Sequence, residues 1–276
     1  MITFLNIGHM GQLGNQLFQF SALYGLSLHL DDSVLLPVEN IYKVAYKGRT
    51  YQSSLDLFNC FDLSELFLTS KENLHVQHYY KQPSFRYDPH FWNIEKNTSI
   101  EGYFQSEKFF LQYRKDLLTL LQFKSQIRKL ADWHLNKLKE HGHEIVGIHV
   151  RRKDYVNDQI DCKSSYYLRA IDYMHLAGKT HFVVVSDDLE WCKEQFKDVA
   201  NMHYMQDSGH YVDLCLLSLC DHNILCNSSF GWWGSWLNQK ESRIVVAPKI
   251  WCPESKVDGF QQDVRDVYCN HWTVLL

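Results

Sequence analysis

EIVGIHVRRKDY, residues 144 to 155, is the stretch around which this chain is organised. A run of mainly β-branched apolar residues ends there in two adjacent arginines, Arg151 and Arg152. The run has the length and composition of a buried strand, which predicts that both guanidinium groups lie at a strand end. Because side chains alternate along a strand, we expect His149 and Arg151 on one face and Arg152 on the other.

The arginine pair predicts a phosphate ligand. Two neighbouring guanidinium groups repel each other unless an anion lies beside them, and their planar shape matches phosphate oxygens in a bidentate way. Ligands of open α/β sheets also bind at the carboxyl ends of strands. The alternative is that Arg151 and Arg152 only form ion pairs with Asp154 and Asp158 in a solvated loop.

Composition limits the class of protein. The chain has 276 residues, of which 45% are hydrophobic, enough for one large α/β domain or two smaller ones. Its formal net charge is −4 and it has no basic cluster, so we expect no nucleic-acid partner. The eight cysteines lack C-x-x-C spacing, and we interpret them as reduced, mostly buried thiols with no metal site.

The amino terminus, MITFLNIGHMG, predicts no signal peptide and no transmembrane segment. It has no basic region, and its apolar run is far too short for either role. We therefore expect a soluble, cytoplasmic protein, with peripheral membrane association left open.

The first half opens with a predicted strand at 2–7, a glycine loop and a helix. The loop is spaced G-x-x-G-x-x-G and includes Gly11 and Gly14, which differs from the G-x-G-x-x-G spacing of dinucleotide folds. Asn15 and Gln16 lie at the helix start, where free backbone N–H groups favour an anion. The loop glycines have two interpretations. They let a ligand approach the backbone closely, or they let a tight turn pack.

A long helix is predicted from about 108 to 140, ended by the His-Gly-His sequence at 141 to 143. We place the domain boundary there, with one domain at 1–141 and a second at 142–276. The second half alternates regularly between strands and helices, which predicts a parallel sheet covered on both faces, a Rossmann-like domain. The strands are expected at 145–150, 181–186, 202–205, 223–226 and 244–247, and the helices at 164–177, 189–196 and 211–220, with a further helix from Ser229.

Polar segments follow two more predicted strand ends. Asp187 and Asp188 come after one strand, where they can bind ribose hydroxyls or a purine edge, or simply cap the next helix. The segment from Asn227 to Phe230 follows another strand, and the hydroxyls of Ser228 and Ser229 can bind phosphate or cap a helix. Three tryptophans in that last helix predict burial on all sides: Trp232, Trp233 and Trp236.

Five segments together resemble glycosyltransferase family 11, the galactoside α-1,2-fucosyltransferases. They are GQLGNQLFQF at 11–20, HVRRKDY at 149–155, VSDDLEW at 185–191, DLCLLSLCDHNILCNSSFGWWGSWLN at 213–238 and RIVVAPKIW at 243–251. The resemblance is collinear and implies an α/β fold, a B-type glycosyltransferase with two Rossmann-like domains facing across a cleft. The lack of an amino-terminal anchor resembles the soluble bacterial or viral type.

The resemblance also implies the reaction and the donor site. The expected activity is inverting transfer of L-fucose from GDP-β-L-fucose to the 2-hydroxyl of a galactose on a glycan, without a metal or a bound cofactor. The amino-terminal domain would mainly bind the acceptor and the carboxyl-terminal domain GDP-fucose. By position, Arg151 and Arg152 match the diphosphate-binding pair and Asn15 the G-x-x-G-N-Q loop, while Ser228, Ser229 and Phe230 match the donor segment.

Departure of GDP develops negative charge on the β-phosphate, which preorganised arginines can stabilise. Inversion requires the acceptor hydroxyl to lose its proton, and Asp154 is the first candidate base, with His149 as runner-up or as a scaffold beneath the arginines. Alternatively, Asp154 orients Arg152 and water takes the proton. The rival functions are a fucosyltransferase of another linkage, a nucleotide-dependent oxidoreductase and a carbohydrate-binding module.

Overall fold

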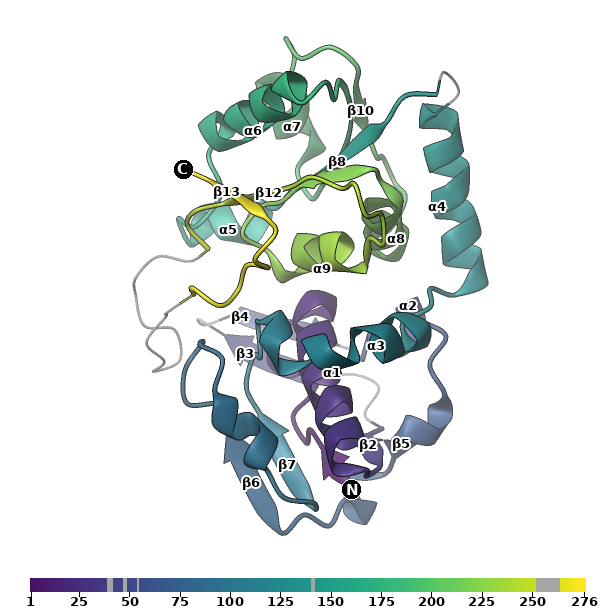
Figure 1. Ribbon diagram of the computed structural model, residues 1–276, viewed down its shortest axis with the longest axis vertical. Helices are drawn as coiled ribbons and strands as arrows, with labels where there is room; N and C mark the ends of the chain where they lie inside the picture. Colours follow the sequence, from purple (N-terminus) through teal and green to yellow (C-terminus); the bar gives the residue numbers. More distant parts are fainter. Residues whose placement is uncertain (39–41, 47–48, 54, 140–141, 252–263) are drawn as a thin grey trace. The chain divides into compact units, whose positions relative to one another are not determined.

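The structure, a computed structural model, describes residues 1–38, 42–46, 49–53, 55–139, 142–251 and 264–276 (Figure 1). These residues form two compact units. The first comprises Met1–Lys124 with the described part of Glu254–Cys269, and the second comprises Ser125–Pro253 with Asn270–Leu276. The chain thus divides at Ser125, earlier than the predicted residue 142, because helix α4 (Ser125–Leu138) packs against helix α8 (His210–Leu219) of the second unit.

A parallel five-stranded sheet in the order β5-β2-β1-β7-β6 organises the first unit. Its strands are β1 (Ile2–Thr3), β2 (Val34–Pro37), β5 (Leu68–Thr69), β6 (His78–Lys81) and β7 (Thr98–Glu101), and a separate antiparallel hairpin joins β3 (Tyr42–Tyr46) to β4 (Arg49–Ser53). The predicted first helix is present as α1 (Leu13–Leu30), and most of its side chains are buried. The other helices are short: α2 (Leu57–Cys60), α3 (Arg114–Leu120), and the 3₁₀ turns η1 (Glu65–Phe67), η2 (Lys71–Asn73), η3 (Pro89–Asn93), η4 (Glu107–Phe109) and η5 (Leu111–Tyr113).

The predicted strand at 2–7 was too long. Strand β1 ends at Thr3, and the chain then turns, with the N–H of Ile7 donating to the carbonyl of Phe4 over 3.2 Å. Phe4 and Ile7 are both fully buried. The apolar run in the sequence extends past β1 because the residues of the following turn are also buried. A sequence pattern does not distinguish such a turn from a longer strand.

The single helix predicted from 108 to 140 was wrong. The chain instead forms η4, η5, α3 and α4, with a break at residues 121–124. At this break the backbone pairs with the end of α2: the N–H of Lys124 donates to the carbonyl of Cys60 over 3.1 Å. The rings of Phe61 and Phe123 pack there with centroids 4.8 Å apart. These contacts interrupt a stretch whose local composition favours helix throughout.

The second unit contains a parallel six-stranded sheet in the order β10-β9-β8-β11-β12-β13. Its strands are β8 (Ile145–Val150), β9 (His181–Ser186), β10 (Met202–Tyr204), β11 (His222–Ile224), β12 (Val245–Pro248) and β13 (Thr273–Leu275). Numbered within the unit, the order is 3-2-1-4-5-6, the order of Rossmann domains that bind dinucleotides. The predicted Rossmann-like second half is confirmed, and the topological switch point lies between β8 and β11.

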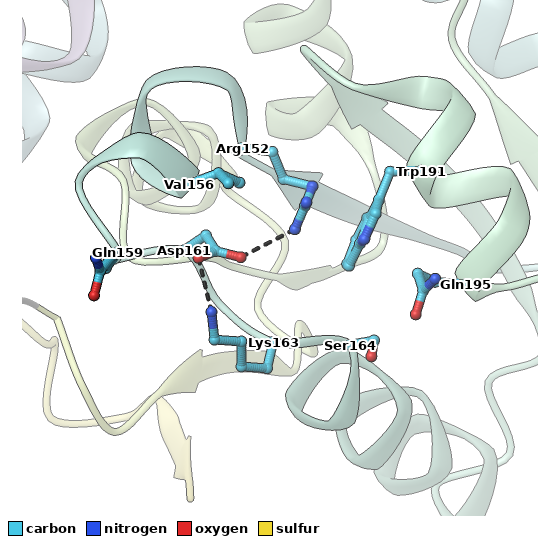
Figure 2. Close-up of a pocket in the computed structure, with 8 residues that line it drawn as sticks. All are labelled: Arg152, Val156, Gln159, Asp161, Lys163, Ser164, Trp191 and Gln195. Carbon is cyan, nitrogen blue, oxygen red and sulfur yellow. Dashed lines mark hydrogen bonds and ion pairs between the residues drawn. The ribbon is translucent and has the colours of Figure 1, made fainter.

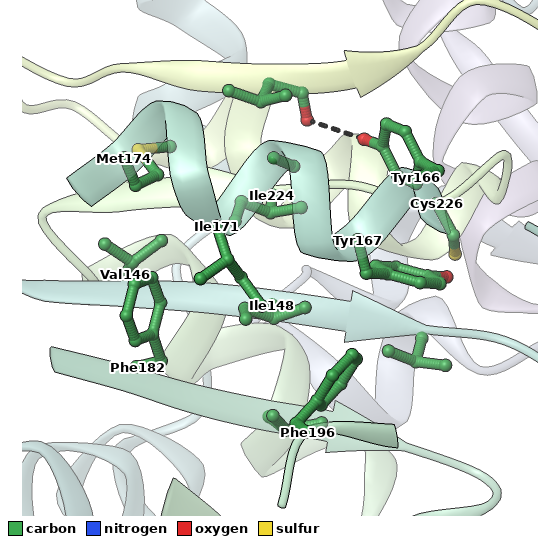
Figure 3. Close-up of a cluster of buried hydrophobic side chains, with 14 of the residues drawn as sticks. Val146, Ile148, Tyr166, Tyr167, Ile171, Met174, Phe182, Phe196, Ile224 and Cys226 are labelled. Atoms are coloured by element: carbon green, nitrogen blue, oxygen red, sulfur yellow. Dashed lines mark hydrogen bonds between the residues drawn. The ribbon is translucent and has the colours of Figure 1, made fainter. Parts of the chain in front are cut away.

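Helices α6 (Ser164–Leu176) and α7 (Leu189–Gln195) cover one face of this sheet, and Figure 3 shows α6 lying over β8 with Ile148, Tyr167 and Ile171 between them. Ser164 begins α6 as the predicted range has it, and Lys163 occupies the N-cap position without a side-chain cap. The sequence also gave no sign of α5 (Lys153–Asn157) or β13, which are a single helical turn and a three-residue edge strand.

Helix α9 (Ser229–Leu237) packs against α8, and its residues from Gly231 to Leu237 are buried. Its three tryptophans, Trp232, Trp233 and Trp236, have exposed fractions of 0%, 0% and 2%, so the predicted burial on all sides is confirmed. A Cβ atom on Gly234 would lie 2.7 Å from Cβ of Leu217 in α8. The absence of a side chain at Gly234 is therefore what lets these two helices approach so closely.

No helix in the described part of the chain is both long and apolar enough to cross a membrane.

Replacing Ile148 by alanine should lower the free energy of unfolding by about 3 kcal/mol, because the side chain is fully buried between β8 and α6. Urea denaturation of the purified protein measures this change. Leu176→Ala is the matched control, since Leu176 is 90% exposed in the same unit and its loss should change the free energy by no more than about 0.5 kcal/mol. Equal effects of the two substitutions would contradict the packing described.

Candidate active site

The predicted site residues of the second unit gather where β8, β9 and β11 end. Arg151 and Arg152 follow β8, Asp187 and Asp188 follow β9, and the segment 227–230 leads from the end of β11 into the first turn of α9. Because parallel strands end at one edge of the sheet, these three segments meet at the switch point where open α/β sheets bind ligands.

Arg151 is held by two carboxylates. Its Nε and Nη2 donate to the two oxygens of Asp154 over 2.8 and 3.1 Å, and Nε lies 3.3 Å from Oδ2 of Asp187. Burial disfavours the guanidinium charge, but these carboxylates outweigh it and raise the pKa of Arg151. Nη1 of Arg151 has no hydrogen-bond partner within the ranges that the structure covers. One end of the guanidinium is thus fixed, and the other can receive an anion.

Arg152 points to the other face of the sheet, as strand alternation predicted. Its guanidinium carbon lies 4.0 Å from the centre of the Trp191 ring (Figure 2). Nε donates to Asp188 over 3.2 Å and Nη1 to Asp161 over 3.0 Å, while Asp161 is also paired with Lys163. Of the ion pairs in the predicted alternative, the one between Arg151 and Asp154 is present, whereas Arg152 pairs with Asp161 and Asp188.

Tyr155 connects Arg151 to the start of α9. Its hydroxyl is hydrogen-bonded to Ser228, and its ring lies 5.9 Å from the Arg151 guanidinium. Ser228 occupies the N-cap position, but its hydroxyl does not cap the helix. The backbone N–H groups of the first turn, including those of Ser229 and Phe230, have no partner within the helix. They contribute the positive end of the helix dipole to the site.

His149 is buried on the α9 side of β8. Its Nδ1 lies 3.2 Å from Sγ of Cys226, and its ring centre lies 5.1 Å from that of Phe230. A Cβ atom on Gly231 would approach Nδ1 to 2.5 Å, so only glycine fits there. Burial, assisted by the charge of Arg151, lowers the pKa of His149 to about 3. A neutral imidazole of such low basicity fits the predicted scaffold better than a base at neutral pH.

Asn227, Asp187 and Asp188 have structural contacts of their own. Nδ2 of Asn227 donates to the carbonyls of Ile160 and Trp251 over 2.8 and 3.0 Å. Asp188 caps α7 by accepting from the N–H of Trp191, as the alternative prediction held. Asp187 is not a cap, since its Oδ1 accepts the backbone N–H of Arg152 over 2.8 Å.

The glycine loop belongs to the first unit and is fixed by amide side chains. Gly11 has a φ of +110°, and a Cβ there would lie 2.0 Å from Nδ2 of Asn15. Asn15 donates to the carbonyl of Met10 over 3.2 Å and accepts from Gln105 over 2.8 Å. Gln16 accepts the N–H of Asp56 over 2.9 Å, and Gly14 is buried in the first turn of α1. Gly11 thus needs glycine for its backbone conformation and for space.

Two cavities flank the arginines. One, of about 330 Å³, is lined by Arg152, Val156, Gln159, Asp161, Lys163, Ser164, Trp191 and Gln195 (Figure 2). The other, of about 370 Å³, contains Ser186, Asp187 and residues 205–209, and Asp213 of α8 also lines it. Burial raises the pKa of Asp213 to about 6, although a hydrogen bond from Ser208 opposes this.

Sequence reasoning missed Asp213, Trp191 and Asp161 as members of the site. Asp213 lies in the first turn of a predicted helix that follows a strand, and only this position could have drawn attention to it. Trp191 and Asp161 reach Arg152 through folding of α7 and of the α5–α6 loop. Among the described residues, no three His, Cys, Asp or Glu side chains are arranged to hold a metal ion.

The chain is similar in sequence to glycosyltransferases from bacteria and animals. It is 30% identical over 285 residues to the O-antigen biosynthesis glycosyltransferase WbnK of Escherichia coli, covering 87% of this chain and 92% of that protein. It is 27% identical over 275 residues to an alpha-1,2-colitosyltransferase of the same organism, covering 91% and 93%. Galactoside alpha-(1,2)-fucosyltransferase 2 of Oryctolagus cuniculus is 24% identical, covering 84% of this chain and 66% of that protein.

Solved structures show the same fold at low identity. POFUT1 in complex with GDP-fucose aligns with a TM-score of 0.52 at 12% identity, covering 88% of this chain and 96% of that one. The fucosyltransferase NodZ from Bradyrhizobium also aligns with a TM-score of 0.52 at 12% identity, covering 84% and 91%. These matches confirm the predicted B-type glycosyltransferase fold with its two parallel α/β sheets.

The family model described as glycosyl transferase family 11 matches residues 2–275, nearly the whole chain. The resemblance seen in the arginine, glycine-loop and Asn-Ser-Ser-Phe segments is thereby confirmed, and the chain belongs to glycosyl transferase family 11.

Proposed function

We propose that this protein transfers L-fucose from GDP-β-L-fucose to the 2-hydroxyl of a galactose residue, with inversion, to form an α-1,2 linkage. The observation that carries the proposal is Arg151, whose open Nη1 lies at the switch point of the second sheet and is linked through Tyr155 to the start of α9. Relatives named as α-1,2-glycosyltransferases support the linkage.

The leaving group determines what this site must do. When the bond to fucose breaks, negative charge develops on the β-phosphate of GDP. Arg151 and the first-turn N–H groups of α9 are fixed before the reaction, so they can stabilise that charge without reorganisation. The hydroxyls of Ser228 and Ser229 add further donors at the same helix start. These residues thus supply the charge stabilisation that a metal ion provides in other transferases.

Arg152 serves a different purpose in this proposal. Its guanidinium is stacked on Trp191 and paired with Asp161 and Asp188, and its backbone N–H holds Asp187. Asp187 in turn contacts Arg151. We therefore assign Arg152 to positioning Arg151, whereas the family resemblance paired both arginines with the diphosphate.

Asp213 offers a place for the base of the nucleotide. Guanine presents its ring N–H and its exocyclic amino group along one edge, and a carboxylate accepts from both. Asp213 lines the cavity that Asp187 also lines. A guanine in this cavity would therefore bring the diphosphate toward the arginine end of β8.

Asp154 is the candidate base from the sequence, but both of its oxygens accept from Arg151. To take a proton from the acceptor, the carboxylate would have to give up part of this ion pair. The geometry therefore favours Asp154 as a positioning residue for Arg151, with the acceptor proton leaving to water. In this proposal the amino-terminal unit binds the acceptor, and the acceptor is a galactose-containing glycan.

A second candidate donor is GDP-colitose, because one relative is named an alpha-1,2-colitosyltransferase. Colitose differs from fucose by the missing 3-hydroxyl. The test is transfer from GDP-fucose and from GDP-colitose, in parallel, to lactose in excess EDTA, with the product linkage assigned by NMR. An α-1,2-fucosylated product supports the proposal. Transfer of colitose alone would show that the donor sugar is colitose and not fucose. No transfer of either sugar, together with no thermal stabilisation by GDP, would refute it.

Arg151→Ala should lower kcat by about two to three orders of magnitude, since a preorganised donor to the developing charge is lost. Arg152→Ala should instead lower the melting temperature, because it leaves the buried carboxylate of Asp161 with only an exposed lysine. Steady-state kinetics and thermal unfolding of both variants separate the two roles. If Arg152→Ala is folded and as inactive as Arg151→Ala, the division of roles is wrong.

Asp154→Asn should retain activity to within about tenfold, because the amide still accepts one hydrogen bond from Arg151 and no base is removed. The pH profile of kcat/KM should keep its shape. If Asp154 is the base, the variant loses several orders of magnitude, and the acid limb of the profile disappears. The kinetics of Asp154→Asn between pH 5 and 8 decide between these roles.

The affinity for GDP should fall as the pH drops below about 6, because Asp213 can accept from both guanine donors with its two oxygens only when its carboxyl group is ionised. Above this pKa the ionised form dominates, and the affinity should level off. Isothermal titration calorimetry with GDP from pH 5 to 8 measures the effect. Asp213→Asn should bind more weakly and lose this pH dependence, and an unchanged profile in the variant would exclude Asp213 from the guanine site.

A further inference from the structure

The outer side of helix α4 carries apolar and basic side chains that the fold does not use. Helix α4 packs against α8 (Figure 1), and Ala131 and Leu135 are its buried residues. Trp133 lies about 200° around the helix from Ala131, and Leu130 lies one turn before Trp133. Both are 52% exposed. A tryptophan and a leucine on one ridge therefore leave about half of their side-chain surface open to solvent.

Lysines flank this ridge. Lys129, Trp133 and Lys137 follow one another at intervals of four residues, so they lie on the same side of α4. The ammonium of Lys137 lies 3.6 Å from the centre of the Trp133 ring. Arg128 adds a third cation and is paired with Asp132 over 2.9 Å. We call Lys129, Leu130, Trp133 and Lys137 the α4 ridge.

The charge of helix α4 is opposite in sign to that of the whole chain. The complete sequence has a formal net charge of −4, whereas α4 has three cations and one carboxylate. His134 does not add to this charge, because burial and the nearby Lys137 lower its pKa. Helix α4 thus carries an excess of positive charge next to two exposed apolar side chains.

We propose that the α4 ridge binds the surface of a bilayer that contains anionic phospholipids. Tryptophan is favoured at the level of lipid headgroups, and lysines beside it pair with lipid phosphates while their stems cover apolar surface. A planar, fluid surface needs no complementary groove, which suits a ridge on a single helix. The inference goes beyond the proposed function and does not depend on which sugar is transferred.

The test is cosedimentation of the full chain with vesicles of phosphatidylcholine, with and without about one third of phosphatidylglycerol. The protein should bind the anionic vesicles, and binding should weaken as salt is raised. Lys129→Ala and Lys137→Ala should each reduce the partition coefficient about fivefold. Trp133→Ala should reduce it by about tenfold or more. Transfer to a water-soluble acceptor should stay unchanged in all three variants.

The matched controls lie elsewhere on the same unit. Leu176→Ala removes a side chain that is 90% exposed, and Lys197→Ala removes an exposed lysine, and neither should alter vesicle binding. The proposal fails if wild type does not bind anionic vesicles, or binds both kinds equally. It also fails if the controls weaken binding as much as the ridge variants do. Self-association in solution that Trp133→Ala abolishes, without vesicle binding, would assign the ridge to a second copy of the chain.

Discussion

The site depends on Asp187, whose two oxygens hold the two arginines in different ways. One oxygen accepts the backbone N–H of Arg152, and the other lies 3.3 Å from Nε of Arg151. Asp187 follows the strand next to β8, so the carboxylate ties together two neighbouring strand ends. Without it, Arg151 would keep only the ion pair with Asp154, which comes from its own loop, and would lose its contact to the neighbouring strand end. The position of Arg151 therefore follows from an interaction between strands, in addition to its own sequence.

Strand alternation places the two arginines in different surroundings. Val146, Ile148 and Val150 lie in the core under α6, so Arg152 continues that face and reaches Trp191, while His149 lies against α9. Arg151 lies on the same face as His149, near the start of α9. Two residues that look equivalent in the sequence thus have different surroundings: one is a packed structural cation, and the other keeps an open donor at the switch point. The burial of His149 beneath them keeps its imidazole neutral, so it adds no positive charge to the site.

Much of the second unit could be predicted from the sequence, because its strands are continuous apolar runs with turn residues between them. The strand at His181–Ser186 and the buried tryptophan helix follow directly from such patterns. The first unit was predicted poorly, since β1 and β5 have two residues each, too few to show a period. At the site, the sequence pattern predicted where the strands end, but it did not predict which side chains contact the two arginines or line the cavities. Asp161, Trp191 and Asp213 join it through long-range contacts, and Asp154 proved to be tied to Arg151, where the sequence had suggested Arg152.

The most direct test of the role of Arg151 is a crystal structure of the protein with GDP bound. It should show the β-phosphate on Nη1 of Arg151 and on the first-turn N–H groups of α9, with Arg152 still stacked on Trp191. A diphosphate bound to Arg152 in the cavity beside Trp191, with Arg151 making no contact to it, would contradict the proposed site.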